Sequence, residues 1–134
     1  MVTEALVKEA LSSEMISAGE ALTRRLDDAG FGVTASFWFY LPDANAWRLF
    51  VASPEVSTHG AKEAYKQVQS AIWQMAGDQR KISLKDVTVV ESRDRLVSLL
   101  RRLIKTGPGI SGVRLSGNAI DGVLIEDAYV YRLV

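Results

Sequence analysis

The sequence predicts an α+β domain, in which three helices pack against a mixed five-stranded sheet. Three observations lead to this class. Segments with helical spacing of apolar residues alternate with segments in which every second residue is apolar. Two pairs of extended segments are joined by turns typical of hairpins, and helical segments separate the remaining extended ones. The predicted order of elements is α-β-β-α-β-α-β-β.

The first predicted helix covers residues 3–29, because apolar side chains recur there at every third or fourth position. Thr3 is a suitable N-cap, and Gly30 suits the left-handed position that follows many helices. A capping-box pattern at residues 17–20 leaves a second arrangement open, in which one helix ends and another begins there.

A hairpin is predicted next, from strands at residues 32–41 and 46–53 that are rich in aromatic and β-branched residues. The connecting residues 42–45 (Pro-Asp-Ala-Asn) are typical of a turn. A loop of four residues places Tyr40 opposite Trp47. Both faces of the hairpin are apolar, which predicts that it is covered on both sides or lies centrally in its sheet.

The middle of the chain supplies two further helices and one strand. The second helix is predicted to begin at Ser57 or Thr58 and to end near Ala76, before Gly77. The third is capped by Ser92, covers residues 93–105 and ends before Gly107-Pro108. Between these two helices, the segment 82–90 contains a short strand, most clearly at Val87–Val90.

The chain ends in a second predicted hairpin, formed by residues 112–120 and 123–133 around an Asp121-Gly122 turn of type I′. A two-residue turn sets the register, with Ser116 opposite Asp127. One face of the hairpin is then apolar and the other polar. The polar face carries the side chains of Arg114, Ser116, Asn118, Asp127, Tyr129 and Tyr131.

This polar face is the best candidate for a site, with Asp127 as a base or ligand and Arg114 as an anion clamp, beside Tyr129 and Tyr131. Glu126 falls on the apolar face opposite Gly117, where burial would raise the pKa of its carboxyl as in a general acid. The alternative is a bulge near Gly117 or Glu126 that turns the carboxylate outward.

Composition limits the possible functions. The 134 residues predict a single domain spanning 1–134, with 48% hydrophobic residues and a formal net charge of zero. The absence of cysteine excludes disulfides and thiolate metal sites, and the one histidine, His59, allows no histidine cluster. Neither a metal nor a cofactor is expected. The N-terminal residues do not resemble a signal peptide, and no apolar run spans a bilayer, so a cytoplasmic protein without a membrane partner is expected.

Two local motifs are weak. Residues 107–112 spell GxGxxG, but they follow a helix and precede a strand, whereas a dinucleotide site needs the reverse order. His59 lies beside two hydroxyl residues near the predicted start of the second helix, where a neutral imidazole suits a base. Without a nucleophile motif or an acid placed by the sequence, a surface histidine is the simpler interpretation of His59.

The region 80–105 holds eight basic and three acidic residues, and the predicted helix 93–105 would present Arg101 and Lys105 on its outer face. Such a stripe binds phosphate in nucleic-acid-binding proteins. Basic residues near a helix C-terminus also complement the helix dipole. Because the chain is neutral overall, we expect no specific nucleic-acid binding.

Aromatic side chains favour an interaction protein. Three tryptophans and two-faced apolar strands occur in a short chain, and Trp73 lies off the apolar stripe of its helix, where it is available for a subunit contact. The leading hypothesis is a protein that acts by self-association, as a dimer, or by binding another protein. The alternatives are an enzyme with its site on the C-terminal hairpin and a nucleic-acid-binding protein that uses helix 93–105.

Overall fold

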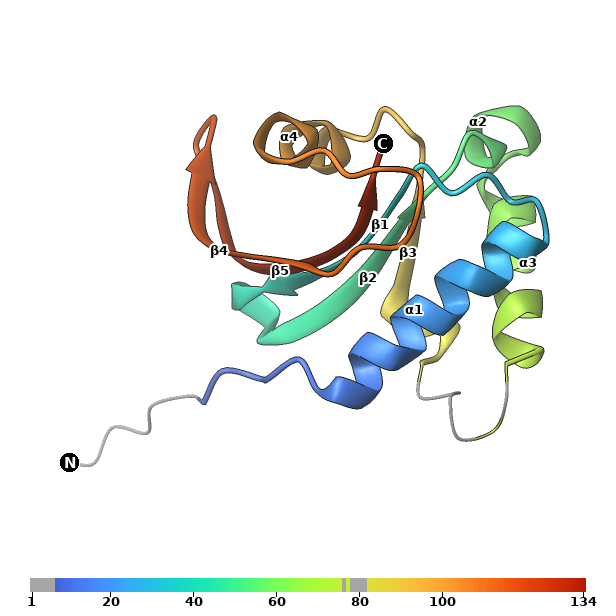
Figure 1. The fold of residues 1–134 in the computed structure, drawn as a ribbon, viewed down its shortest axis with the longest axis horizontal. Helices are drawn as coiled ribbons and strands as arrows, with labels where there is room; N and C mark the ends of the chain where they lie inside the picture. The colour runs from blue at the N-terminus through green and yellow to red at the C-terminus, as the bar shows by residue number, and fades with distance from the viewer. Residues whose placement is uncertain (1–6, 76, 78–81) are drawn as a thin grey trace.

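The computed structural model describes residues 7–75, 77 and 82–134, and within them it contains four α-helices and one mixed sheet of five strands (Figure 1). The predicted α+β class is confirmed. The helices are α1 (Ser13–Asp28), α2 (Glu55–His59), α3 (Ala61–Trp73) and α4 (Arg95–Leu103). The strands are β1 (Ala35–Leu41), β2 (Ala46–Ala52), β3 (Val87–Val90), β4 (Val113–Ile120) and β5 (Val123–Leu133).

The strands lie in the order β3-β2-β1-β5-β4. β2 and β3 are parallel, and every other neighbouring pair is antiparallel. The predicted register of the first hairpin is confirmed, since Tyr40 pairs with Trp47. β1 therefore lies in the centre of the sheet, between its hairpin partner β2 and the last strand β5, which returns from the far end of the sequence.

Helices cover both faces of this sheet (Figure 1). α4 lies on the concave side and packs Val97 and Leu100 against Phe37. α1 and α3 lie on the opposite side, where Leu22 of α1 and Val68 of α3 belong to a second, larger core. Alternate side chains of β1 enter the two cores, which explains why its sequence is apolar at nearly every position.

The first helix is shorter than its periodicity predicts, because α1 begins only at Ser13. Ser12 caps it by accepting a hydrogen bond from the Met15 N–H at 3.1 Å. α1 is continuous through residues 17–20, and its C-terminus closes on Gly30 at φ 72° as expected. The predicted cap Thr3 lies outside the described residues.

Residues 7–12 instead run along the first hairpin, because their backbone finds partners there. The Trp47 indole N–H donates to the Glu9 carbonyl at 2.8 Å. The Asn45 side chain accepts from the Glu9 N–H at 2.8 Å and donates to the Val7 carbonyl at 3.0 Å. These tertiary hydrogen bonds replace those that a helix would form, so the helical spacing of this segment is overridden.

Two more helix predictions need correction. The single helix predicted from Ser57 is divided into α2 and α3, because Gly60 adopts φ 87° and ψ 159°, which no helix contains. α4 covers residues 95–103 rather than 93–105. Its cap is Asp94, whose side chain accepts from two N–H groups in the first turn of the helix. Ser92 is not the cap, because its hydroxyl pairs with that of Thr34 at 2.9 Å.

α1 comes very close to the sheet at Gly19. A Cβ atom at this position would lie 2.7 Å from Trp38 Nε1 and 2.8 Å from the Tyr131 ring, and would also meet the Tyr131 hydroxyl. Because Gly19 has no side chain, side chains of the strands come close enough to form hydrogen bonds with the backbone of α1. Tyr131 donates to the Ile16 carbonyl at 2.5 Å, and Trp38 donates to the Met15 carbonyl at 3.2 Å and to Tyr131 Oη at 3.1 Å.

Gly19→Ala should therefore destabilise the protein by about 1–3 kcal/mol, the usual cost of overpacking a close contact. The sign is informative, because alanine is the better helix former and would otherwise add stability. Urea unfolding measures the difference. Gly107→Ala is the matched control, since a Cβ added at Gly107 would meet no described atom within 4 Å and the backbone there has no positive φ. Equal stability of the two variants would contradict the close approach.

Candidate functional site

The second hairpin has the register that the Asp-Gly turn predicts. Ile120 pairs with Val123, Ser116 with Asp127 and Arg114 with Tyr129. Asp121 and Gly122 both adopt positive φ, at 48° and 76°, as a type I′ turn requires. The predicted pairing is confirmed, and Arg114, Ser116 and Asp127 lie together as expected. Asn118 does not share their face, because the alternation of the strand reverses at Gly117.

Asp127 is the centre of a charged cluster. Its side chain is only 7% exposed, and its carboxylate accepts from Arg114 Nε at 2.6 Å and Arg114 Nη2 at 2.8 Å. Lys8 Nζ donates to the same carboxylate at 2.8 Å, and the Ser116 hydroxyl lies at 3.5 Å. A bidentate guanidinium and an ammonium thus neutralise one buried carboxylate. Their hydrogen bonds leave the carboxylate oxygens with little capacity to accept a further hydrogen bond.

Lys8 and Arg114 are far apart in the sequence, and both lie against aromatic rings of the first hairpin. Lys8 Nζ lies 4.7 Å from the centre of the Tyr40 ring, and the Arg114 guanidinium carbon lies 5.5 Å from the centre of the Trp47 ring. Such cation–π contacts add to the ion pairs. A surface hollow of about 250 Å³ adjoins the cluster and is lined partly by residues 8–11.

These contacts determine the protonation state of the cluster. The hydrogen bonds from Arg114 are the main cause that lowers the pKa of Asp127 to about 2, and Lys8 adds to them, while burial acts in the opposite direction. The pKa of Arg114 is raised, mainly by its hydrogen bonds to Asp127. An anion locked in this way is a poor proton acceptor at neutral pH, so the geometry does not favour Asp127 as a general base.

The two tyrosines of the predicted site have different environments. Tyr131 is buried, and burial is the main cause that raises the pKa of its phenol. Its hydroxyl is already used in the contact with α1 described above. Tyr129 is half-buried and stacks edge-on against Tyr131 at 5.4 Å between ring centres. Both therefore act as packing residues in this geometry, and the raised pKa of Tyr131 does not favour it as an acid or base near neutral pH.

Glu126 is half-buried, so it is not the buried carboxylate that regular alternation predicts. Gly117 and Glu126 are not paired, although the pairs on either side of them, Ser116–Asp127 and Asn118–Ile125, are formed. At this position the side chains that faced one side of the hairpin begin to face the other. Gly117 adopts φ 64° there, without an extra residue in either strand. The irregularity lies where the bulge was expected, but the register on its two sides is the same.

The two edges of the sheet differ. β3 has four residues, and the Val89 N–H on it donates to the hydroxyl of Tyr65 from α3 at 3.0 Å. β4 has eight residues and forms its ladder with β5 alone. Among the described residues, the other hydrogen bond to its backbone comes from the Asn118 side chain to the Ser116 carbonyl at 3.1 Å. β4 is therefore the open edge of the sheet.

The open edge also lacks most of the features by which strands avoid pairing with other chains. Its eight residues contain one charged side chain, that of Arg114, and no proline. Val113, Leu115 and Ile120 are partly buried and pack against the core under α4. Beyond the turn, Leu124 is 60% exposed.

The remaining predicted residues do not join this hairpin. His59 is exposed at the C-terminal end of α2, rather than at a helix start, and its Nδ1 lies 2.6 Å from Glu55 Oε2. Trp73 is 68% exposed at the last residue of α3. On α4, Arg101 donates to the carbonyls of Ser92 and Val134, at 2.5 and 2.8 Å.

Arg102 pairs with Asp121 in the turn of the second hairpin, and Lys105 lies beyond the end of α4. With Arg101 also engaged within the chain, two basic side chains of the predicted helix 93–105 are bound to neighbouring backbone or side-chain groups. The geometry therefore does not favour a continuous phosphate-binding face on α4.

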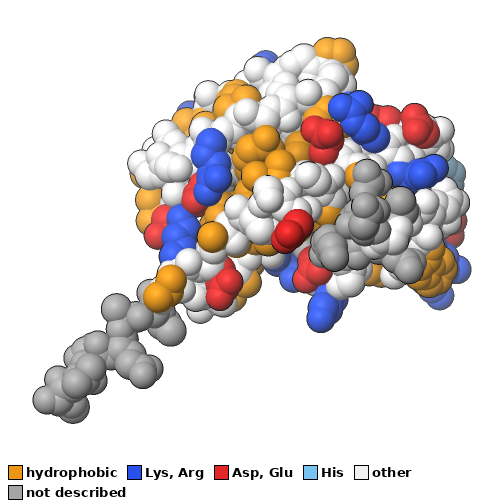
Figure 2. All heavy atoms as spheres, turned by 60° about the horizontal axis from the view of Figure 1, so that its bottom comes forward, with side chains coloured by type: hydrophobic (Ala, Val, Ile, Leu, Met, Phe, Trp, Pro, Cys, Tyr) orange, Lys and Arg blue, Asp and Glu red, His pale blue; other side chains and the backbone are white. Residues whose placement is uncertain are grey.

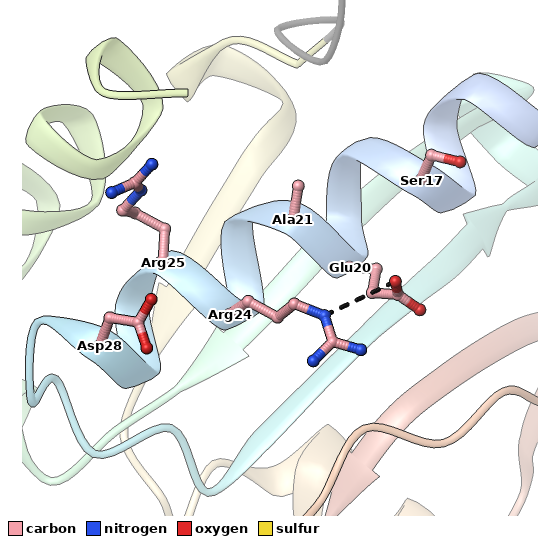
Figure 3. Close-up of a pocket in the computed structure, with 6 residues that line it drawn as sticks. All are labelled: Ser17, Glu20, Ala21, Arg24, Arg25 and Asp28. Atoms are coloured by element: carbon pink, nitrogen blue, oxygen red, sulfur yellow. Dashed lines mark ion pairs between the residues drawn. The ribbon is translucent and has the colours of Figure 1, made fainter. Parts of the chain in front are cut away.

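The surface on the α1 side is mixed in character. Figure 2 shows hydrophobic side chains gathered in the middle of this face, with charged groups around them. A hollow of about 400 Å³ lies on the outer face of α1 (Figure 3). Arg24 and Glu20 face each other there at 3.7 Å, while Arg25 turns toward α3 and donates to the Gln74 carbonyl. Exposed helix residues form most of this hollow, and among the residues that line it none is buried.

Within the described residues, no group of three or more potential metal-ligating side chains occurs, and no helix is long and apolar enough to cross a membrane. Comparison with protein-family models finds no match, and comparisons with curated proteins and with solved structures find none either.

Sequence reasoning found Arg114 and Asp127 but missed Lys8, Tyr40 and Trp47 as members of the same cluster. Lys8 is 119 positions from Asp127 in the sequence. The helical spacing of apolar residues in this region predicted a helix, whereas the segment that contains Lys8 is not helical. A second ion pair was also missed: Arg132, only 5% exposed, is bidentate with Asp27 at 2.8 and 2.9 Å. No local pattern in the sequence indicates either of these long-range pairs.

Removing either partner of the Arg114–Asp127 pair should destabilise the fold. We expect Arg114→Ala to cost about 2–3 kcal/mol, somewhat below the value for a fully buried pair, because the Arg114 side chain is 46% exposed and Lys8 remains. The double variant with Asp127→Ala should show a coupling of about 1–2 kcal/mol in urea unfolding. Additive effects would mean that the two groups do not interact in solution.

The same cluster predicts a pH dependence. Because the pKa of Asp127 is about 2 in the folded protein and 3.8 for the free carboxyl of the unfolded chain, the carboxylate contributes stability above pH 4 that is lost as the pH falls through about 2. The difference in unfolding free energy between wild type and Asp127→Asn should be larger at neutral pH, by ~2 kcal/mol, than at the acid end. Asp43→Asn, at an exposed position without an ion pair among the described residues, controls for the lost charge.

Proposed function

We propose that this protein acts by self-association, pairing the open edge of β4 with the same strand of a second copy. The observation that supports this most directly is the contrast between the two sheet edges. β3 is short and donates to Tyr65, whereas β4 presents eight residues with one charged side chain and, in the part of the chain that the structure describes, no covering element. Unprotected edges of this length are the usual sites of strand addition.

The occupant is a second copy because the edge suits itself. Antiparallel strand pairing is self-complementary, and a two-fold dimer is the commonest closed assembly. The chain has a formal net charge of zero, so net charge does not oppose the association of two copies. Pairing would also cover the partly buried apolar residues Val113, Leu115 and Ile120 at the margin of the core.

The enzyme alternative has less support. Asp127 is bound by Arg114 and Lys8, its pKa is low, and Tyr131 is occupied by the α1 backbone. The cluster therefore serves to hold the N-terminal segment 7–12 on the sheet. We expect the protein to act in the cytoplasm, with a second copy of itself or another protein as its partner.

We expect light scattering to give more than one chain's mass at micromolar concentrations. Strand pairing alone covers less than the roughly 800 Å² per partner of a standard interface, so the dimer should dissociate on dilution. Hydrogen exchange should show protection of β4 amides that grows with concentration, while the amides of β3 stay unchanged. A single-chain mass at all concentrations would overturn the proposal.

The exposed Trp73 offers a control for the rival interface on α3. Trp73→Ala should leave the mass and its concentration dependence unchanged, because Trp73 is on α3 and not on the β4 edge. Loss of the dimer in this variant, with no change in exchange at β4, would assign the interface to α3 and contradict pairing through the sheet edge.

A further inference from the structure

The exposure pattern along β4 is a palindrome. From Val113 to Ile120 the residues are alternately partly buried and exposed, but the alternation reverses at the centre, where Ser116 and Gly117 are both exposed. The partly buried residues are Val113, Leu115, Asn118 and Ile120, and the exposed ones are Arg114, Ser116, Gly117 and Ala119. The order is the same when it is taken from either end of the strand.

From this pattern we infer the register of the self-association proposed above, on which the inference rests: the two-fold axis passes between Ser116 and Gly117. Residues directly opposite in an antiparallel pair lie on the same face of the sheet. With this axis, Val113 lies opposite Ile120 of the second copy and Leu115 opposite Asn118. Every partly buried residue then meets a partly buried one, and every exposed residue an exposed one.

Other registers of the strand lose this match. An axis that passes through Gly117 itself sets the exposed Ser116 opposite the partly buried Asn118. Moving the axis by one residue toward either end sets a central exposed residue opposite a partly buried neighbour, namely Ser116 against Leu115 or Gly117 against Asn118. A strand with regular alternation has no self-pairing of this kind centred between two residues, so the reversal at Gly117 is what permits it.

Charge agrees with the same register. Arg114 is the one charged residue of β4, and in this pairing it lies opposite Ala119 of the second copy rather than opposite another arginine. Gly117, with φ 64°, lies beside the axis, so the irregular backbone of each copy lies at the centre of the paired strands. The ladder would then be formed by residues 113–115 of each copy against 118–120 of the other.

Single cysteines test the register, since the chain contains no other thiol. In Ser116→Cys the two Cα atoms would lie roughly 6 Å apart across the axis, within the range of a disulfide. In Ala119→Cys they would be offset by about 17 Å along the strands and could not be joined. Mild oxidation should give a reducible dimer on gel electrophoresis for Ser116→Cys alone.

Charge at position 119 is an independent test. Ala119→Glu would face Arg114 twice, once on each side of the axis, and should tighten the dimer by about twofold to thirtyfold. Ala119→Arg should weaken it over the same range, and both variants should unfold like the wild type as single chains because Ala119 is exposed. Sedimentation measures the dissociation constants.

The failures can be told apart. Three results would overturn this register while self-association stands. They are a dimer that cross-links through Ala119→Cys, a dimer that cross-links through neither cysteine, and a dissociation constant that does not change with the charge at position 119. A chain that stays monomeric in light scattering overturns the proposed function and the register with it.

Discussion

The burial of β1 on both of its faces is the constraint on which the rest of the structure depends. Phe37 faces the core under α4, and Trp38 faces the core under α1 and α3. A strand of this kind is stable only between two covering layers, because each exposed aromatic ring would cost the free energy of its burial. The helices on both faces and the central place of β1 in the sheet follow from that requirement.

The side toward α1 shows how closely the layers are joined. Gly19 lets the helix backbone come within hydrogen-bonding distance of Trp38 and Tyr131, so the buried polar atoms of these aromatic residues are satisfied by Met15 and Ile16 carbonyls. Residues 7–12 extend the same contact past the end of the helix. The ion pair between Lys8 and Asp127 anchors this N-terminal segment to the last strand.

Covering both faces leaves the edges of the sheet as its remaining surface for backbone pairing. At one edge the Val89 N–H donates to Tyr65 of α3, and at the other, within the part of the chain that the structure describes, β4 pairs with β5 alone. The faces of β4 reverse at Gly117, where φ is 64°, and this reversal makes the strand symmetric in its exposure. The proposed self-association thus depends on the open edge, and its register depends on the backbone conformation at Gly117.

Local physics in the sequence was sufficient for the class of the fold, the type I′ turn at Asp121-Gly122 and the registers of both hairpins, since side-chain alternation and turn length determine these. It also brought Arg114 and Asp127 together, because they lie on one hairpin. Tertiary structure decided where α1 begins, how Gly60 divides the second helix and which cation completes the cluster at Asp127. Those outcomes depend on contacts between residues far apart in the chain, and the free energy of such contacts exceeds the weak local preferences that a sequence pattern expresses.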